Sequence, residues 1–266
     1  MRTRIWLPVL ASIVLGACTT PTSQDHLMTV PSPVSNAYSE VDMRLRLMAE
    51  TDINSPCVGA ECNSNRAFNQ QIMQLGEQLA QSAFEMYPDL NKRISRFEFL
   101  VAEKSEPGST SSGSGTVVIF RGVQQLSLNE EALAFLIARE MGHVIGHHHD
   151  KNSTTSIVFS ALAQVLVPVA NIFRGAAALI QTSPVTTSMT TASSVIGSRA
   201  VIENYKSSQL HEADVIAINL LARQGWDRNR IADALTAGTQ LTGDSNWAKE
   251  FRISSMEVNR IEAIWQ

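Results

Sequence analysis

The residues best suited to chemistry are concentrated in one short stretch, residues 139–149, with the sequence Arg-Glu-Met-Gly-His-Val-Ile-Gly-His-His-His. A helix with two histidines four residues apart, and a glutamate beside the first, binds zinc through its imidazoles and uses the carboxylate as a general base. Glu140 and His143 occupy the glutamate and second histidine positions, but Arg139 replaces the first histidine. A guanidinium group stays protonated and has no lone pair for a metal. The stretch therefore predicts a hydrolytic zinc motif that has lost one ligand.

The neighbouring histidines offer a second way to hold a metal. His147 follows His143 by four residues, so both could chelate zinc from one face of a helix that continues this far. His211 and Glu212 are candidate ligands on a later segment. Histidines at the end of a helix are also explained by a solvated terminal turn, where a positive side chain complements the helix dipole. A relocated metal site and the absence of any specific metal are both open alternatives.

The sequence around the motif predicts helices that surround a small sheet. Helical spacing of apolar residues, with start and stop signals, marks five segments: 65–87, 127–148, 200–223, 227–239 and 246–265. The segment with the motif begins at a Ser-x-x-Glu capping box, Ser127 to Glu130. Two strands are predicted at 94–102 and 116–120, with a mobile Ser/Gly-rich loop at 105–115 between them. The predicted fold class is α+β and predominantly α-helical.

A strongly apolar segment follows the motif at residues 157–180. It is interrupted by Gln164, Pro168 and Arg174, whereas a transmembrane helix needs roughly 20 consecutive apolar residues. We therefore expect core helices or a helical hairpin here, with membrane insertion as the alternative. The Ser- and Thr-rich residues 183–198 are expected to form a loop.

The N-terminus predicts export and lipidation. Arg2 and Arg4 precede an apolar run that is too short to span a membrane, which is the layout of a cleaved signal peptide. Residues 15–18, Leu-Gly-Ala-Cys, resemble the lipobox of bacterial lipoproteins. This resemblance implies a lipid anchor on Cys18 and a location at the periplasmic face of the bacterial outer membrane. An ordinary signal peptide with an incidental cysteine is the alternative.

Two further cysteines and the charge balance complete this picture. Cys57 and Cys62 are separated by four residues and are predicted to form a disulfide in an oxidising periplasm, with a metal-binding pair as the alternative. The net charge of −4, without a block of basic residues, argues against nucleic acid as a partner. The expected domains are a signal peptide at 1–17, a lipidated tether with a disulfide loop at 18–64, and the main domain at 65–266.

The order of elements resembles the HExxH zinc metallopeptidases related to the CAAX prenyl protease, in particular their periplasmic lipoprotein branch. The likeness covers roughly residues 65–265, and four stretches carry it: 130–144, His148, 212–214 (Glu-Ala-Asp) and 225–227 (Gly-Trp-Asp). It implies a zincin-type domain with a small β-sheet beside the motif helix, and zinc as the cofactor of an active member.

The same resemblance implies which residues would hold the zinc. The family uses two histidines and a glutamate four residues before the aspartate of its second motif. In this chain these positions fall on Arg139, His143 and Leu210, so only His143 is a retained ligand. The general-base position is Glu140, and Asp214 is the acid that would support the first histidine.

Because two ligands are replaced, we expect a catalytically inactive protein without a cofactor. If the chain is active instead, zinc is its expected cofactor. A catalytic zinc needs three protein ligands, and a cation at Arg139 would repel the metal. Without a Lewis acid, Glu140 has no water to activate at neutral pH. We expect Arg139 instead to pair with Asp214 or Glu140, in a buried bridge that holds the two motif helices together.

Three functions follow as hypotheses. The first is a lipid-anchored pseudo-peptidase that binds peptides or misfolded envelope proteins as a scaffold or quality-control factor. Residues 116–120 would accept an extended peptide by backbone pairing, or form an ordinary core strand. The second is an active zinc endopeptidase that uses His143, His147 and a residue near His211 and Glu212. The third is a structural envelope lipoprotein. The sequence has no nucleophile elbow and no phosphate-binding loop before a helix.

Overall fold

The computed structural model describes residues 31–49, 59–152, 206–240, 243–258 and 260–261. Its named elements are α2 (Ser32–Ala49), α3 (Ala60–Met86), the 3-10 helix η1 (Pro88–Lys92), β1 (Glu98–Ala102), β2 (Ser109–Ser111), β3 (Thr116–Phe120), α4 (Arg121–Gln125), α5 (Glu130–Ile145), α8 (Arg228–Thr239) and α9 (Asn246–Val258). Residues 148–152 and 206–223 are also helical. The predicted α+β, predominantly helical fold is confirmed. Within these ranges no helix is long and apolar enough to cross a membrane.

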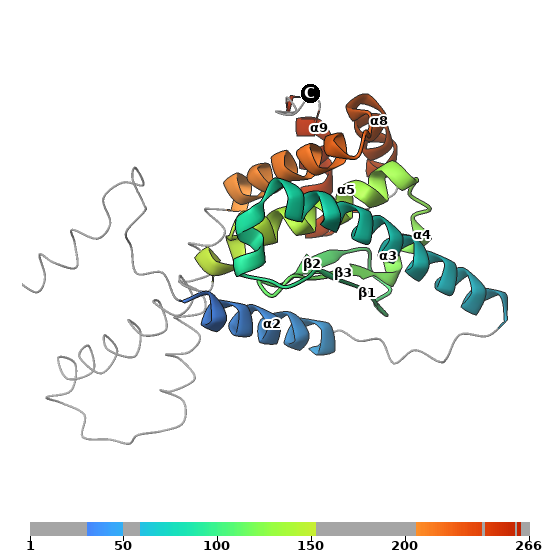
Figure 1. Ribbon diagram of the computed structural model, residues 1–266. Helices are drawn as coiled ribbons and strands as arrows, with labels where there is room; N and C mark the ends of the chain where they lie inside the picture. The colour runs from blue at the N-terminus through green and yellow to red at the C-terminus, as the bar shows by residue number, and fades with distance from the viewer. Residues whose placement is uncertain (1–30, 50–58, 153–205, 241–242, 259, 262–266) are drawn as a thin grey trace, which may run out of the picture.

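The three strands form one mixed sheet in the order β1–β3–β2, with β1 parallel and β2 antiparallel to β3 (Figure 1). Val117 and Ile119 of β3 are fully buried in the core. The prediction of a strand at 116–120 is confirmed, and so is its interpretation as a core strand. The alternative, that this strand accepts a peptide, is wrong because both of its edges are already paired.

β2 lies inside the segment that was predicted to be a mobile loop, 105–115. That prediction is wrong because the serines of this segment are held by carboxylates from two other elements. Ser109 and Ser111 donate hydrogen bonds to Glu140, and Ser112 donates one to Glu40. Composition alone cannot reveal such partners, since they lie far away in the sequence.

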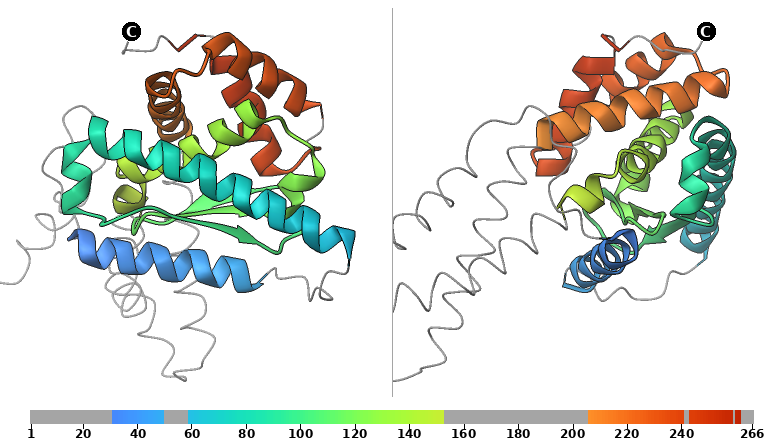
Figure 2. Two further views of the ribbon diagram at one scale, coloured as in Figure 1. Left: turned by 45° about the vertical axis from the view of Figure 1, so that its right-hand side comes forward. Right: turned by 60° about the vertical axis from the view of Figure 1, so that its left-hand side comes forward.

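The sheet is covered on both faces. Helices α3 and α5 lie on one face and α2 lies on the opposite face (Figures 1 and 2). The core between the sheet, α3 and α5 includes Phe68, Ile72, Leu75, Leu79, Phe135, Leu136, Ile137 and Met141. Gly76 of α3 allows close contact with the sheet, because a Cβ there would lie 2.4 Å from the ring of Phe99.

Helix α5 is buried along most of its length and both of its ends differ from the prediction. Its N-cap is Asn129, whose side chain accepts a hydrogen bond from the backbone of Ala132 at 3.1 Å. Ser127 is outside the helix with φ 48°, so the predicted capping box is wrong. The helix ends at Ile145, three residues before the predicted end. His147 then adopts a left-handed conformation, with φ 58°, which turns the chain away from the helix axis.

The N-terminal region is more ordered than predicted. Helix α2 spans Ser32–Ala49, within residues 18–64 that were expected to be a tether with a disulfide loop, and α3 begins at Ala60 instead of residue 65. The signal peptide, Cys18, Cys57 and the segments 157–180 and 183–198 lie outside the described residues. The lipid anchor, the disulfide to Cys62 and the two segments therefore stay predictions.

Candidate functional site at the junction of α5 and residues 206–223

The candidate site forms where α5 crosses the helix at residues 206–223. The absence of a side chain at Gly142 permits the close approach, because a Cβ at this position would lie 2.5 Å from the carbonyl oxygen of Ala213. On α5, Arg139 lies three residues before Gly142 and His143 lies directly after it. On the other helix, Asp214 follows Ala213 directly. The crossing therefore brings the motif of α5 to the second motif, as the resemblance implied.

Arg139 is the largest fully buried side chain among the described residues, with 1% of its surface exposed. Its Nη1 donates to the Oγ of Ser254 at 3.5 Å, while its Nε has no hydrogen-bond partner. Asp214 is 0% exposed, and neither of its carboxylate oxygens has a well-formed hydrogen bond within the described residues. The charge is thus buried as expected, but no direct ion pair within 4.0 Å joins Arg139 to Asp214 or Glu140 in this part of the chain.

The three charges nevertheless act on one another. Burial raises the pKa of Asp214 to about 6, while the charge of Arg139 and the hydroxyl of Ser254 oppose this rise. Burial also raises the pKa of Glu140, again opposed by the charge of Arg139. One guanidinium group therefore compensates two buried carboxyl groups electrostatically without forming an ion pair with either of them.

Replacing Asp214 by Asn is expected to change the pH dependence of stability. A carboxyl group whose pKa is about 6 when folded and 3.8 when unfolded contributes stability that is fully present below pH 3.8 and is lost as the pH rises through 6. The difference in unfolding free energy between wild type and Asp214→Asn should therefore fall by about 3 kcal/mol from roughly pH 3 to pH 7. Urea unfolding across this range measures it. Parallel pH curves for the two proteins would contradict the shift.

Glu140 is held by the sheet. Its Oε1 accepts a hydrogen bond from Ser109 at 2.7 Å and its Oε2 accepts one from Ser111 at 3.0 Å. The indole of Trp247, on α9, donates to the Oγ of Ser109 at 3.1 Å. The general-base position is thus 6% exposed and both of its oxygens are engaged, so the carboxylate is fixed in place by β2.

His143 is connected to the protein surface through a second imidazole. Its Nδ1 lies 2.8 Å from Nδ1 of His148, and Nε2 of His148 lies 3.1 Å from a carboxylate oxygen of Glu212. Burial lowers the pKa of both histidines, well below 6.5 for His143, so both rings are neutral at pH 7. A neutral His148 that donates to Glu212 must accept at Nδ1, so His143 donates there. Nε2 of His143 then keeps its lone pair.

His147 does not join this array. It lies beyond the end of α5, is half exposed, and its Nδ1 is 3.1 Å from Oδ2 of Asp150. Because the helix ends at Ile145, the alternative that His143 and His147 chelate zinc from one helix face does not fit this geometry. His147, His211 and Glu212 instead line an open pocket of about 680 Å³ at the end of α5, whose lining does not include Glu140 or Arg139.

The donor set does not fit a catalytic zinc ion. Of the three positions at which the related peptidases place ligands, Arg139 has no lone pair and Leu210 has no donor atom, and both are buried. Only His143 could bind. Across the described ranges, no group of three or more His, Cys, Asp or Glu side chains is arranged to hold a metal.

Several residues of the site were not identified from the sequence. Ser109 and Ser111 are two residues apart, as residues on one face of a strand are. The many serines and glycines around them led to the prediction of a loop. His148 was assigned to a fraying helix end and is instead 1% exposed. Trp247 contacts the site from α9, and no local pattern indicates such a contact.

Comparison with known proteins identifies the family to which the chain belongs. The family model described as "Peptidase family M48" matches residues 67–264. The chain is 24% identical over 226 residues to the "Beta-barrel assembly-enhancing protease" of Escherichia coli (strain K12), a match that covers 82% of this chain and 42% of the relative. The protein of the same description in Shigella flexneri matches with the same identity and coverage. The chain thus spans about two fifths of the length of these relatives.

Proposed function

This chain belongs to peptidase family M48, and we propose that it is a catalytically inactive member that binds extended or unfolded polypeptides without cleaving them. The observation that carries the proposal is the fully buried guanidinium of Arg139 at a zinc-ligand position, together with Leu210 at another. A buried cation disfavours a divalent metal through charge and occupies its space. The former catalytic centre then acts as a structural junction between two helices.

The binding site for polypeptide is the outer edge of β2 at Ser109, which pairs with no strand among the described residues. Gly108 and Ser112 direct their backbone groups toward β3, as their hydrogen bonds to Phe120 and Thr116 show. Alternate residues of a strand point their backbone groups to opposite edges, so those of Ser109 and Ser111 face away from β3. Ser111 is buried and Ser109 is partly exposed, so an extended peptide can pair with this edge at Ser109, directly beside Glu140 and Trp247.

We assign the protein to the bacterial envelope, where a lipid on Cys18 would anchor it at the periplasmic face of the outer membrane. The lipobox-like residues 15–18 support this location. The relatives named for enhancing β-barrel assembly support misfolded or incompletely assembled envelope proteins as its clients. In this role the chain is a scaffold or quality-control factor that retains a client.

The proposal is tested with the purified mature chain and fluorescently labelled, reduced casein as an unfolded probe. We expect no stoichiometric zinc by elemental analysis, no cleavage of casein, and binding that a chelator does not change. Stoichiometric zinc with chelator-sensitive cleavage that Glu140→Gln abolishes would show an active zinc endopeptidase instead. Absence of both metal and casein binding would leave a purely structural protein.

The position of the binding edge is tested by a matched pair of variants, Ser109→Pro and Ser109→Ala. Both remove the hydroxyl group that contacts Glu140, but only proline removes the backbone N–H that faces the outer edge. Loss of one backbone hydrogen bond should weaken casein binding about tenfold in Ser109→Pro relative to Ser109→Ala. Equal affinity of the two variants would place the binding site elsewhere.

A further inference from the structure

Helix α2 exposes an apolar stripe on the side that faces away from the protein. Val34, Tyr38 and Val41 follow the spacing i, i+4, i+7, which places them on one face of a helix. Their exposed fractions are 51%, 43% and 56%. In the sequence, Leu45 and Met48 continue the same spacing. A helix normally turns such a stripe toward the core, so its outward orientation calls for an explanation.

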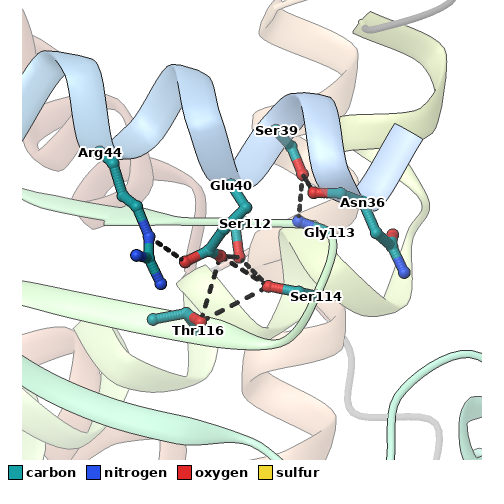
Figure 3. Close-up of polar contacts among 8 residues, drawn as sticks. All are labelled: Asn36, Ser39, Glu40, Arg44, Ser112, Gly113, Ser114 and Thr116. Atoms are coloured by element: carbon teal, nitrogen blue, oxygen red, sulfur yellow. Dashed lines mark hydrogen bonds and ion pairs between the residues drawn. The ribbon is translucent and has the colours of Figure 1, made fainter. Parts of the chain in front are cut away.

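Polar contacts on the opposite side of α2 fix this orientation (Figure 3). Glu40 accepts hydrogen bonds from Ser112 at 2.8 Å and Ser114 at 2.7 Å, both in the turn between β2 and β3. These hydroxyls and the charge of Arg44 lower the pKa of Glu40, although its burial alone would raise it. Ser39 accepts from the backbone N–H of Gly113 at 2.8 Å. The carboxylate therefore stays charged and bound to the turn.

The inward side of α2 is buried as well as bonded. Ser35 is 0% and Met43 is 4% exposed, and Ser35 donates a short hydrogen bond to Asp150. Rotating α2 to bury its stripe would break these contacts and leave the hydroxyl groups of the turn without Glu40. The apolar stripe is thus held outward by the fold itself.

No described segment covers the stripe, since α2 is the outermost layer on its side of the sheet (Figures 1 and 2). A second copy of the chain is a poor occupant. An 18-residue helix is about 27 Å long and about 10 Å wide, a footprint of about 270 Å². A stable protein interface buries roughly 800 Å² on each partner. A single helix therefore offers too little surface for a stable dimer through this contact.

We propose that the stripe of Val34, Tyr38 and Val41 lies against the phospholipid surface to which the chain is anchored. This inference rests on the lipid anchor at Cys18 proposed above. Only 13 residues separate Cys18 from Ser32, and these span at most about 47 Å when fully extended. The anchor thus holds α2 near the bilayer, where a helix with one apolar face binds in the plane of the interface.

The chemistry of the stripe fits this surface. Two valines supply apolar area, and a tyrosine has an apolar ring with a polar tip, which suits the boundary between acyl chains and headgroups. The contact adds a second attachment to the membrane beside the lipid anchor. It also sets an orientation, because α2 against the membrane places the sheet between the bilayer and helices α3 and α5 (Figure 1).

The test is photocrosslinking of the full, lipidated chain in vesicles of phosphatidylethanolamine and phosphatidylglycerol. Benzoylphenylalanine replaces Tyr38 on the stripe or, as a matched control, Met73, which is 49% exposed on α3 at the other face of the sheet. We expect crosslinks to phospholipid from position 38 and none above background from position 73. The double variant Val34→Ser, Val41→Ser should reduce the lipid crosslink at position 38 about tenfold.

Other outcomes overturn the inference in distinguishable ways. Crosslinks from position 38 to a second copy, to residues 153–205 of the same chain, or to nothing would each exclude the lipid contact. The mass of the N-terminal fragment is measured in parallel. A lipidated Cys18 without lipid crosslinks at position 38 contradicts this inference alone, whereas an unmodified Cys18 contradicts the proposed anchor and the inference with it. Casein binding of the soluble chain reports separately on the polypeptide-binding function.

Discussion

Arg139→Ala should lower the free energy of unfolding at pH 7 by about 3–5 kcal/mol, because removal of one member of a buried charge group leaves the others uncompensated. The charge of Arg139 opposes the rise in pKa that burial causes in Asp214 and Glu140, and its side chain is fully buried. Urea unfolding followed by circular dichroism measures the loss. An unchanged melting temperature would show that Arg139 has no structural role.

Two further variants separate charge from packing. Arg139→Met keeps an unbranched apolar stem and removes only the charge. Combining it with Asp214→Asn removes the buried carboxylate as well, so the double variant should be more stable than Arg139→Met alone. If the double variant is instead destabilised by the sum of the two single effects, the charges of Arg139 and Asp214 do not interact.

Restoring the missing ligands should restore metal binding. The double variant Arg139→His, Leu210→Glu would place two imidazoles and a carboxylate at the positions that the related peptidases use, which is a complete protein ligand set for zinc. We expect one zinc ion per chain with a dissociation constant of about 1 µM or tighter, equivalent to about 8 kcal/mol. Isothermal titration calorimetry and elemental analysis measure it, and the metal should raise the melting temperature.

The control for this gain is the variant Arg139→His, Leu210→Gln, which has nearly the same shape but a neutral amide in place of the carboxylate. It should bind zinc much more weakly, as should either single variant. If wild type binds zinc as tightly as the double variant, the metal site lies elsewhere in the chain and the replaced ligands do not support the proposed inactivity.

The fold could be predicted where the signal is local. The strand at Thr116–Phe120 and the helix starts at residues 227 and 246 agree with the structure to within one residue, because a β-branched run, an aspartate N-cap and apolar spacing each act over a few residues. The missed elements depend on distant partners. β2 exists because Glu140 and Glu40 bind the hydroxyl groups of its segment, and serine content alone indicates a loop.

The candidate site shows the same division. The spacing of Arg139, Glu140 and His143, and their relation to Asp214, could be read from the sequence because both motifs lie on helices. The partner of His143 could not. A single left-handed residue at position 147 reverses the chain so that His148 faces His143, and a histidine gives no local sign of this conformation. A direct ion pair of Arg139 with Asp214 or Glu140 was expected. In the described part of the chain, Arg139 instead acts on both carboxyl groups through its charge, without an ion pair.

One hairpin connects the two ends of this arrangement mechanically. The turn between β2 and β3 binds Glu40 of α2, and the strand that leads into it binds Glu140 of α5. Tension applied to α2 would therefore reach the segment that binds Glu140 through these hydrogen bonds, in parallel with the contact of Ser35 with Asp150. The hairpin thus couples the position of α2 to the position of the Glu140 carboxyl group.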